Sequence, residues 1–155
     1  MRRMLTFAML AALVAAACGG SAQAARSSAA TGRVIELTMQ TVSFEPNTIT
    51  LKAGEHVTIR FLNRSSGEHE FMAGRTAQLG AGGFHEDALA GVKVDTTGST
   101  AAVHEMGHGG FGLQVAAGKT AEASFDVPLK AGRYEFGCFV PGHYEAGMKG
   151  TLVIN

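Results

Sequence analysis

Apolar and polar residues alternate with a period of two along much of the chain after residue 32. Alternation of this kind is typical of β-strands that bury one face in a core. Short Ala-Gly pairs separate several of the alternating segments and are typical of turns. No long segment has helical spacing, so the pattern predicts an all-β sandwich or barrel. The expected strands cover residues 35–39, 48–52, 57–61, 121–126, 134–138 and 151–155.

One long segment, residues 73–112, does not follow this alternation. It is rich in Gly and Ala and carries three histidines with weak periodicity. A loop of this length is unusual inside a compact domain and is commonly functional or mobile. We expect a Gly-rich insert there, with a short helix near residues 85–90.

The N-terminus has the features of an export signal. Arg2 and Arg3 precede the uncharged apolar stretch 4–17, which is shorter than the roughly 20 residues that span a bilayer. The following Ala-Ala-Ala-Cys18-Gly resembles the lipobox of bacterial lipoproteins, in which the cysteine is lipidated. An ordinary cleavage site at residues 22–24 is the alternative.

This N-terminal pattern suggests three parts of the chain. We expect a signal peptide of the lipoprotein type at residues 1–18 and a flexible linker at 19–31. The linker is rich in small and polar residues. A single domain at 32–155 follows, with the insert at about 73–112. The protein would then be exported to the periplasm or another extracytoplasmic compartment, and anchored to a membrane through Cys18.

The charge of the chain excludes one class of function. The chain has 13 basic and 13 acidic residues, and loss of the signal removes two basic ones. Such a balance lacks the basic footprint of a nucleic-acid-binding protein.

Beyond the signal, Cys138 is the only thiol in an oxidising compartment, where unpaired cysteines call for an explanation. Metal ligation is one explanation, and a disulfide with Cys18 is the alternative.

The segment YEFGCFVPGHYEAGMKG carries the candidate metal ligands. Cys138, His143 and Met148 follow one another at five-residue intervals, with a Pro141-Gly142 turn between the first two. A thiolate and imidazoles in a trigonal plane, with a long axial thioether, make a blue-copper site. Taken singly, the three residues are more typical of a buried thiol, a surface histidine and a core methionine. Their order before a terminal strand favours a shared metal.

A second histidine must come from elsewhere in the chain. His69 follows the expected strand 57–61 within SSGEHEFM, at the rim of the sheet, which makes it the preferred ligand. His56 is more typical of an exposed residue at the start of a strand. The remaining candidates are His85, His104 and His108.

With these residues, the chain resembles the cupredoxins, the plastocyanin and azurin family. The ligand-loop spacing resembles rusticyanin, and HEF at 69–71 together with VPGHYEAGM at 140–148 looks most like periplasmic cupredoxins associated with bacterial copper tolerance. A further shared run is Phe44-x-Pro46-x-x-Ile49-x-Leu51-x-x-Gly54-x-x-Val57.

The resemblance implies a Greek-key β-sandwich with one type 1 copper per chain. His69, Cys138 and His143 would form the plane and Met148 the axial ligand. Glu70 stands where plastocyanins and azurins usually have an Asn that ties the ligand loops together. We therefore expect the hydrogen bonds around the thiolate to differ from the family pattern.

The expected function is a single-electron carrier of the bacterial cell envelope. It would exchange electrons with a redox partner protein. The alternative is a copper-tolerance protein that sequesters copper or passes it to a copper-handling protein. An enzyme is not expected, because four protein ligands leave no open position on the metal. We expect a monomer.

The insert carries candidates for a second, looser copper site, namely His85, His104, Met106 and His108; the alternative is a solvated flexible loop without a metal. Residues 104–108 also match the zinc-protease motif H-E-x-x-H, which needs a helix. The glycines at 107, 109 and 110 disfavour a helix, so we do not expect a protease. A glycosylation sequon at residues 63–65 is taken as chance.

Overall fold

The computed structural model describes residues 32–97, 100, 102–106, 110–128 and 130–155. Strands account for all the regular secondary structure of these residues. In chain order they are β1 Arg33–Met39, β2 Phe44–Glu45, β3 Thr48–Leu51, β4 His56–Asn63, β5 His69–Gln78, β6 Gly83–Asp87, β7 Ala102–Met106, β8 Gly110–Val115, β9 Thr120–Asp126, β10 Gly132–Gly137 and β11 Lys149–Ile154.

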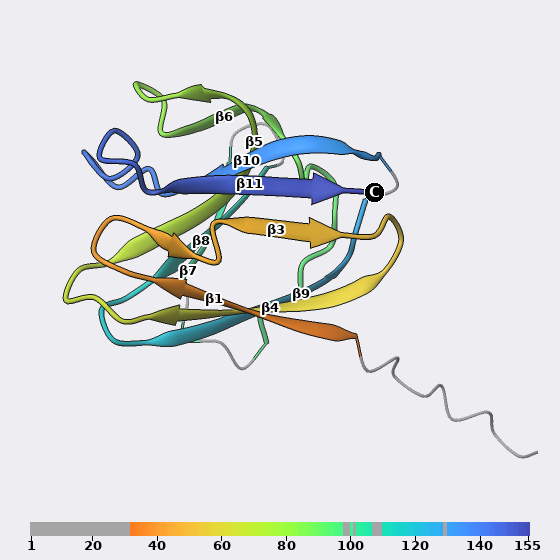
Figure 1. Ribbon diagram of the computed structural model, residues 1–155, viewed down its shortest axis with the longest axis horizontal. Coiled ribbons are helices and arrows are strands. Elements are labelled where there is room, and N and C mark those ends of the chain that lie inside the picture. The colour runs from red at the N-terminus through yellow and green to blue at the C-terminus, as the bar shows by residue number, and fades with distance from the viewer. Residues whose placement is uncertain (1–31, 98–99, 101, 107–109, 129) are drawn as a thin grey trace, which may run out of the picture.

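The strands form two sheets that face each other (Figure 1). The smaller sheet has the order β2-β1-β4-β9, and the larger has the order β3-β11-β10-β5-β8-β7, with β6 added beside β5. β1 runs parallel to β4, and β3 runs parallel to β11, whereas the other pairings are antiparallel. The expected all-β class is confirmed, and each predicted strand coincides with an observed one to within a few residues.

The core lies between the sheets and follows from the alternation in the sequence. Along β4, Val57, Ile59 and Phe61 are buried while the intervening residues are partly exposed. Phe71 and Phe136 from the larger sheet fill the centre. Phe71 packs against Phe61 with ring centroids 4.9 Å apart, and against Phe136 at 5.6 Å. Buried aromatic pairs of this kind contribute strongly to core stability.

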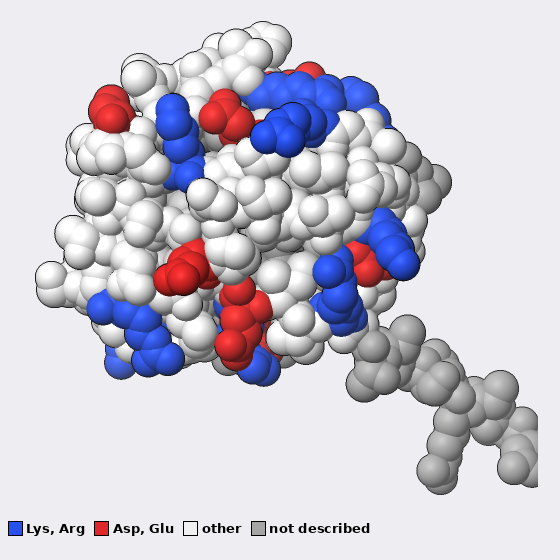
Figure 2. All heavy atoms as spheres, in the orientation of Figure 1, with Lys and Arg blue, Asp and Glu red and all other residues white. Residues whose placement is uncertain are grey.

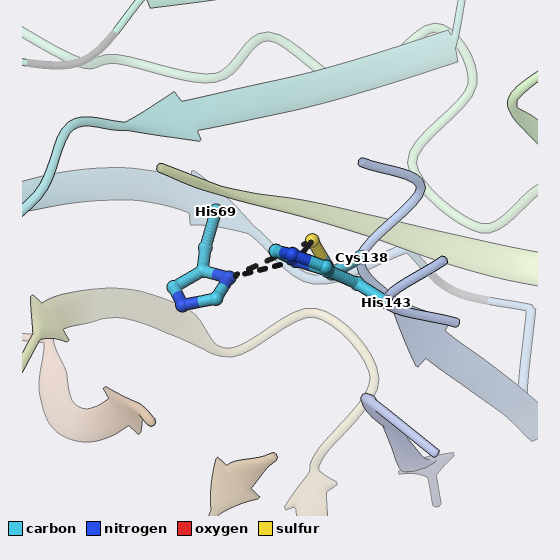
Figure 3. A group of neighbouring side chains, drawn as sticks. All are labelled: His69, Cys138 and His143. Carbon is cyan, nitrogen blue, oxygen red and sulfur yellow. Dashed lines mark hydrogen bonds between the residues drawn. The ribbon is translucent and has the colours of Figure 1, made fainter. Parts of the chain in front are cut away.

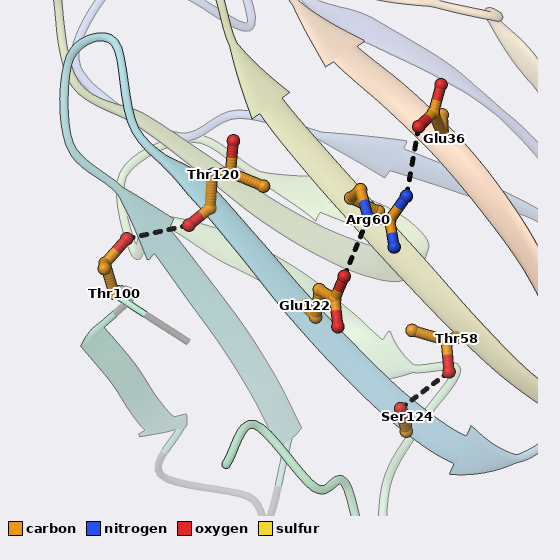
Figure 4. A network of polar contacts seen from close by, with 7 residues as sticks. All are labelled: Glu36, Thr58, Arg60, Thr100, Thr120, Glu122 and Ser124. Carbon is orange, nitrogen blue, oxygen red and sulfur yellow. Dashed lines mark hydrogen bonds and ion pairs between the residues drawn. The ribbon is translucent and has the colours of Figure 1, made fainter. Parts of the chain in front are cut away.

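The outer face of the smaller sheet carries polar cross-strand pairs instead (Figure 4). Arg60 on β4 lies between two acids, with its Nε 2.7 Å from Glu122 on β9 and an Nη 3.3 Å from Glu36 on β1. Thr58 and Ser124 share a hydrogen bond of 2.7 Å across the same strands. Opposite charges on neighbouring strands favour this register. On the face drawn in Figure 2, basic and acidic side chains are interspersed.

The insert is more regular than the sequence predicts. Residues 73–112 contain the second half of β5, all of β6 and β7, and the start of β8. The expected helix near 85–90 is wrong, because residues 85–87 belong to β6 and residues 88–90 form a turn. Ala88 donates a backbone hydrogen bond to the Ala73 carbonyl at 2.8 Å, and Leu89 is buried in the core.

Gly74 explains how β6 can lie so close to β5. A Cβ atom at this position would stand 2.2 Å from the Glu86 carbonyl oxygen and 2.5 Å from the Phe84 Cβ. Asp87, at the end of β6, accepts backbone hydrogen bonds from Leu89 at 2.6 Å and from Phe111 at 2.9 Å. The insert is therefore joined to both β5 and β8.

Across the part of the chain that the structure describes, no helix could serve as a membrane span. The expected signal peptide, linker and Cys18 lie outside the described residues.

Candidate metal centre

Three of the four candidate ligands lie where strands begin or end, at one end of the sandwich. His69 is the first residue of β5, Cys138 follows β10 directly, and Met148 directly precedes β11. His143 lies in the loop between the latter two. Gly142 has a φ of +85°, which confirms the turn expected at Pro141-Gly142.

Backbone hydrogen bonds fold this loop on itself. The amide of His143 donates to the Val140 carbonyl at 2.9 Å, and the amide of Met148 donates to the His143 carbonyl at 2.9 Å. The amide of Cys138 donates to the Met148 carbonyl at 3.1 Å, which closes the loop at its base. One loop therefore holds three candidate ligands in fixed relation.

The potential ligand atoms of His69, Cys138 and His143 converge (Figure 3). The two Nδ1 atoms are 3.2 Å apart, and the Cys138 Sγ is 3.4 Å from Nδ1 of His143 and 3.9 Å from Nδ1 of His69. The point equidistant from these three atoms lies about 2.0 Å from each, close to the bonds of about 2.0–2.3 Å that metal ions form with imidazole and thiolate. The three side chains therefore fit one metal ion.

Burial separates these groups from solvent to different degrees. His69 is 1% exposed, and Cys138 and Met148 are fully buried, whereas His143 is partly exposed. Burial lowers the pKa of His69, and the neighbouring His143 lowers it further. Burial also raises the pKa of the Cys138 thiol. The lowered pKa favours the neutral form of His69, and a neutral imidazole is the form that binds a metal ion.

The Cys138 thiol accepts a hydrogen bond from the backbone of Glu70, the residue that stands where plastocyanins and azurins usually have Asn. The backbone amide of Glu70 donates to the Cys138 Sγ at 3.3 Å. The amides of Glu70 and Val140 both lower the pKa of the thiol, although they do not outweigh burial. Donors that face a thiolate are among the features that tune a copper–thiolate site.

His69 is held on its far side by a polar network that the sequence analysis did not identify. Its Nε2 lies 2.7 Å from the Ser65 hydroxyl, which in turn lies 2.9 Å from the Asn63 Oδ1. Asn63 is only 1% exposed. Its burial leaves no room for a glycan on the folded domain, which agrees with the interpretation of the sequon as chance.

An aromatic cluster covers the outside of the ligand loop. Phe139 stacks on Tyr144 with ring centroids 4.9 Å apart, and Phe84 of β6 contacts both rings edge-on at 5.1 and 6.4 Å. The ammonium of Lys149 lies 4.6 Å from the centroid of the Tyr144 ring. Phe139, Tyr144 and Lys149 directly follow the three candidate ligands of the loop in the sequence. Phe84 joins the insert to it.

Of the other candidate ligands, His56 and His85 have described side chains, and neither belongs to this cluster. His56 is exposed at the start of β4 and pairs with Asp126 at 2.8 Å, as expected for a residue at the start of a strand. His85 is exposed on β6. The side chains of His104 and Met106, and all of His108, lie outside what the structure describes, so the second copper site stays a prediction. Residues 104–106 belong to strand β7 rather than a helix.

Comparison with known proteins agrees with this geometry. The family model described as copper binding proteins, plastocyanin/azurin family, matches residues 33–155. A "copper-resistant cuproprotein CopI" of Rubrivivax gelatinosus is 38% identical over 126 residues, which cover 79% of this chain and 66% of that protein. CopI of Pseudomonas aeruginosa is 34% identical over 159 residues, which cover 89% of this chain and 82% of that protein.

Solved structures agree as well. Auracyanin A, a "blue" copper protein from a green thermophilic photosynthetic bacterium, superposes with a TM-score of 0.54 and 28% identity, over 79% of this chain and 98% of that one. The chain therefore belongs to the plastocyanin/azurin family of copper-binding proteins.

Proposed function

We propose that this protein is a single-electron carrier that holds one type 1 copper ion. The convergence of His69, Cys138 and His143 on one point carries this proposal. Met148 would complete the site as the axial ligand. It is buried, and its backbone is hydrogen-bonded to the backbones of Cys138 and His143. Copper supplies the redox chemistry when bound, by cycling between Cu(I) and Cu(II).

The protein's own part is to hold the ligands in one arrangement for both oxidation states. Two loops, each closed by hydrogen bonds and anchored on strands, fix the ligand positions. Soft sulfur donors favour Cu(I), and imidazole serves both states. Little rearrangement is then needed when an electron arrives or leaves.

Electron exchange requires a contact surface near the copper. His143 is the partly exposed ligand, so its ring edge is the natural port. Of the apolar neighbours, Ala146 is exposed, whereas Val140 and Phe139 are only partly exposed. A small, weak interface of this kind suits transient redox encounters. The partner would be another redox protein, and the carrier itself would be a monomer.

Four protein ligands leave no open coordination position for a substrate. A catalytic copper would need such a position, as catalytic zinc does. This supports a carrier rather than an enzyme.

The test is the visible absorption of the domain, residues 32–155, after one equivalent of Cu(II). A site of this type should give an intense copper–thiolate absorption band at about 600 nm. Cys138→Ser should abolish the band, and His56→Ala should leave it intact because His56 lies elsewhere. Absence of the band from the wild-type protein would sink the proposal.

Copper tolerance is the second candidate, favoured by the two CopI relatives, which are named as copper-resistant cuproproteins. In this role the same site, with the histidines and methionine of the insert, would sequester or pass on copper. Titration beyond one equivalent distinguishes the two functions. Further copper bound after the thiolate band saturates favours tolerance, and strict one-to-one binding favours the electron carrier.

We also propose an extracytoplasmic location, supported by the pattern of residues 1–18. The mass of the protein extracted from membranes tests lipidation at Cys18. A mass that matches cleavage after residue 24 would instead indicate a free periplasmic protein.

A further inference from the structure

We propose that Ser65 sets the tautomer of His69, and through it the direction of the hydrogen bond between His69 and His143 in the metal-free protein. Ser65 is thus a positioning residue for the copper site. This inference rests on the proposed role of both histidines as copper ligands through Nδ1.

The first step is the orientation of the Asn63 side-chain amide. Its Nδ2 lies 2.8 Å from the Gly67 carbonyl oxygen, 2.9 Å from that of Val115 and 3.1 Å from that of Ala116. Only an NH₂ group can face three carbonyl oxygens favourably, so the amide orientation is fixed. The opposite atom, Oδ1, must then be the acceptor that faces Ser65.

The second step is the direction of the Ser65 hydroxyl. A hydroxyl has one proton to donate and two lone pairs to accept with. The Ser65 Oγ lies 2.9 Å from the Asn63 Oδ1 and 3.0 Å from the Gly67 carbonyl oxygen, both acceptors. The Gly67 amide donates to it at 3.2 Å. If the hydroxyl proton pointed to His69, both of these oxygens would face a lone pair of the Ser65 Oγ. The proton is therefore directed to one of the two oxygens.

The third step is the tautomer of His69. With its proton directed to an oxygen, the Ser65 hydroxyl can only accept from the His69 Nε2, 2.7 Å away. His69 therefore carries its proton on Nε2 and presents a lone pair on Nδ1. That lone pair points to the site, where a metal would bind it. Partners of this kind on the far nitrogen are a general means of fixing a ligand histidine.

The fourth step concerns His143. Its Nδ1 lies 3.2 Å from the Nδ1 of His69, and two lone pairs at this distance would repel each other. Since Ser65 fixes the His69 Nδ1 as an acceptor, His143 must be the donor in the metal-free protein. For the His143 Nδ1 to bind a metal, its proton would have to leave, and the ring would then carry a proton on Nε2 instead. His143 is the more exposed of the two, so solvent can carry this proton.

The experiment is long-range ¹H–¹⁵N correlation of the imidazole nitrogens in the metal-free domain, above the ordinary histidine pKa of about 6.5. Wild type should show His69 protonated on Nε2 and His143 protonated on Nδ1. Ser65→Ala should lose the His69 preference and bind copper about 10–100-fold more weakly. Ser65→Thr should restore both properties, and Ser66→Ala, at the exposed neighbouring serine, should change neither.

Two results would overturn the inference. One is a wild-type His69 protonated on Nδ1, which needs no variant to detect and so does not depend on the folding of Ser65→Ala. The other is a folded Ser65→Ala that keeps both the tautomer and the copper affinity of wild type. Failure of the proposed function looks different, because the wild-type protein would then lack the copper–thiolate band.

Discussion

The backbone amide of Glu70 lies 3.3 Å from the Cys138 Sγ and donates a hydrogen bond to it. The resemblance to plastocyanins and azurins, which usually have Asn at this place, predicts that Glu70 alters the hydrogen bonds around the thiolate. The finding limits that expectation, because this donor belongs to the backbone and does not depend on the side chain. What Glu70 adds is a negative charge near the sulfur, and this charge raises the thiol pKa further.

Glu70→Gln should therefore leave the copper–thiolate band in place and raise the reduction potential. Removal of a negative charge near the metal favours Cu(I) over the more positive Cu(II). Cyclic voltammetry of the copper-loaded domain measures the potential. Asp126→Asn removes a charge at the far end of β9, beside His56, and should change the potential much less. A lower potential in Glu70→Gln would contradict the electrostatic argument.

Met148→Leu tests the axial position. Met148 is fully buried, and a swap of similar volume should cost less than about 1.5 kcal/mol of stability. The thiolate band should persist, because the trigonal ligands remain, while the reduction potential should rise since the axial thioether is lost. Met39→Leu, an equally buried methionine on β1, is the matched control. Equal potentials in both variants would exclude Met148 as a ligand.

Tyr144 should make stability depend on pH in alkaline solution. Burial and the Glu135 carboxylate raise the pKa of its phenol to about 12 from the ordinary 10. The folded state thus disfavours the phenolate, so the free energy of unfolding is unaffected below pH 10 and falls as the pH rises toward 12. The loss should be on the order of 2 kcal/mol. Denaturant unfolding across this range measures it, and Tyr144→Phe should remove the slope.

Gly74→Ala should destabilise the insert. The added methyl group would overlap the Glu86 carbonyl oxygen and Phe84, and overpacking of this kind typically costs about 1–3 kcal/mol. Amide hydrogen exchange should show faster opening of β6 than in wild type. Gly80→Ala, where nothing lies within 4 Å of the added atom, is the control. Unchanged exchange in Gly74→Ala would mean that β6 does not pack as described.

Much of the fold could be predicted from the period-two pattern, because one face of each strand enters the core. The insert could not, since β6 pairs edge to edge with the second half of β5, and small residues there permit close approach rather than show alternation. Gly74 and Gly110 have this role, and a Cβ at Gly110 would stand 2.4 Å from the Asp87 Oδ2. Periodicity contains no signal for contacts of this kind.

The candidate site was predictable to the extent that its chemistry is encoded in ligand type and spacing. His69, Cys138 and His143 are brought together as expected. Ser65 and the buried side chain of Asn63 were missed because their role depends on how residues 64–68 fold back. The only sequence signal was the position of Ser65 four residues, and of Asn63 six residues, before His69.

The buried side chain of Asn63 has a consequence for producing the protein. Residues 63–65 form a glycosylation sequon, and such sequons are modified in the eukaryotic secretory pathway. The transferase meets the chain before it folds, so a glycan would be attached to an amide that must later be enclosed beside three carbonyl oxygens. Yeast or mammalian secretion would then yield a chain that cannot close its first ligand loop, whereas bacterial expression avoids the modification.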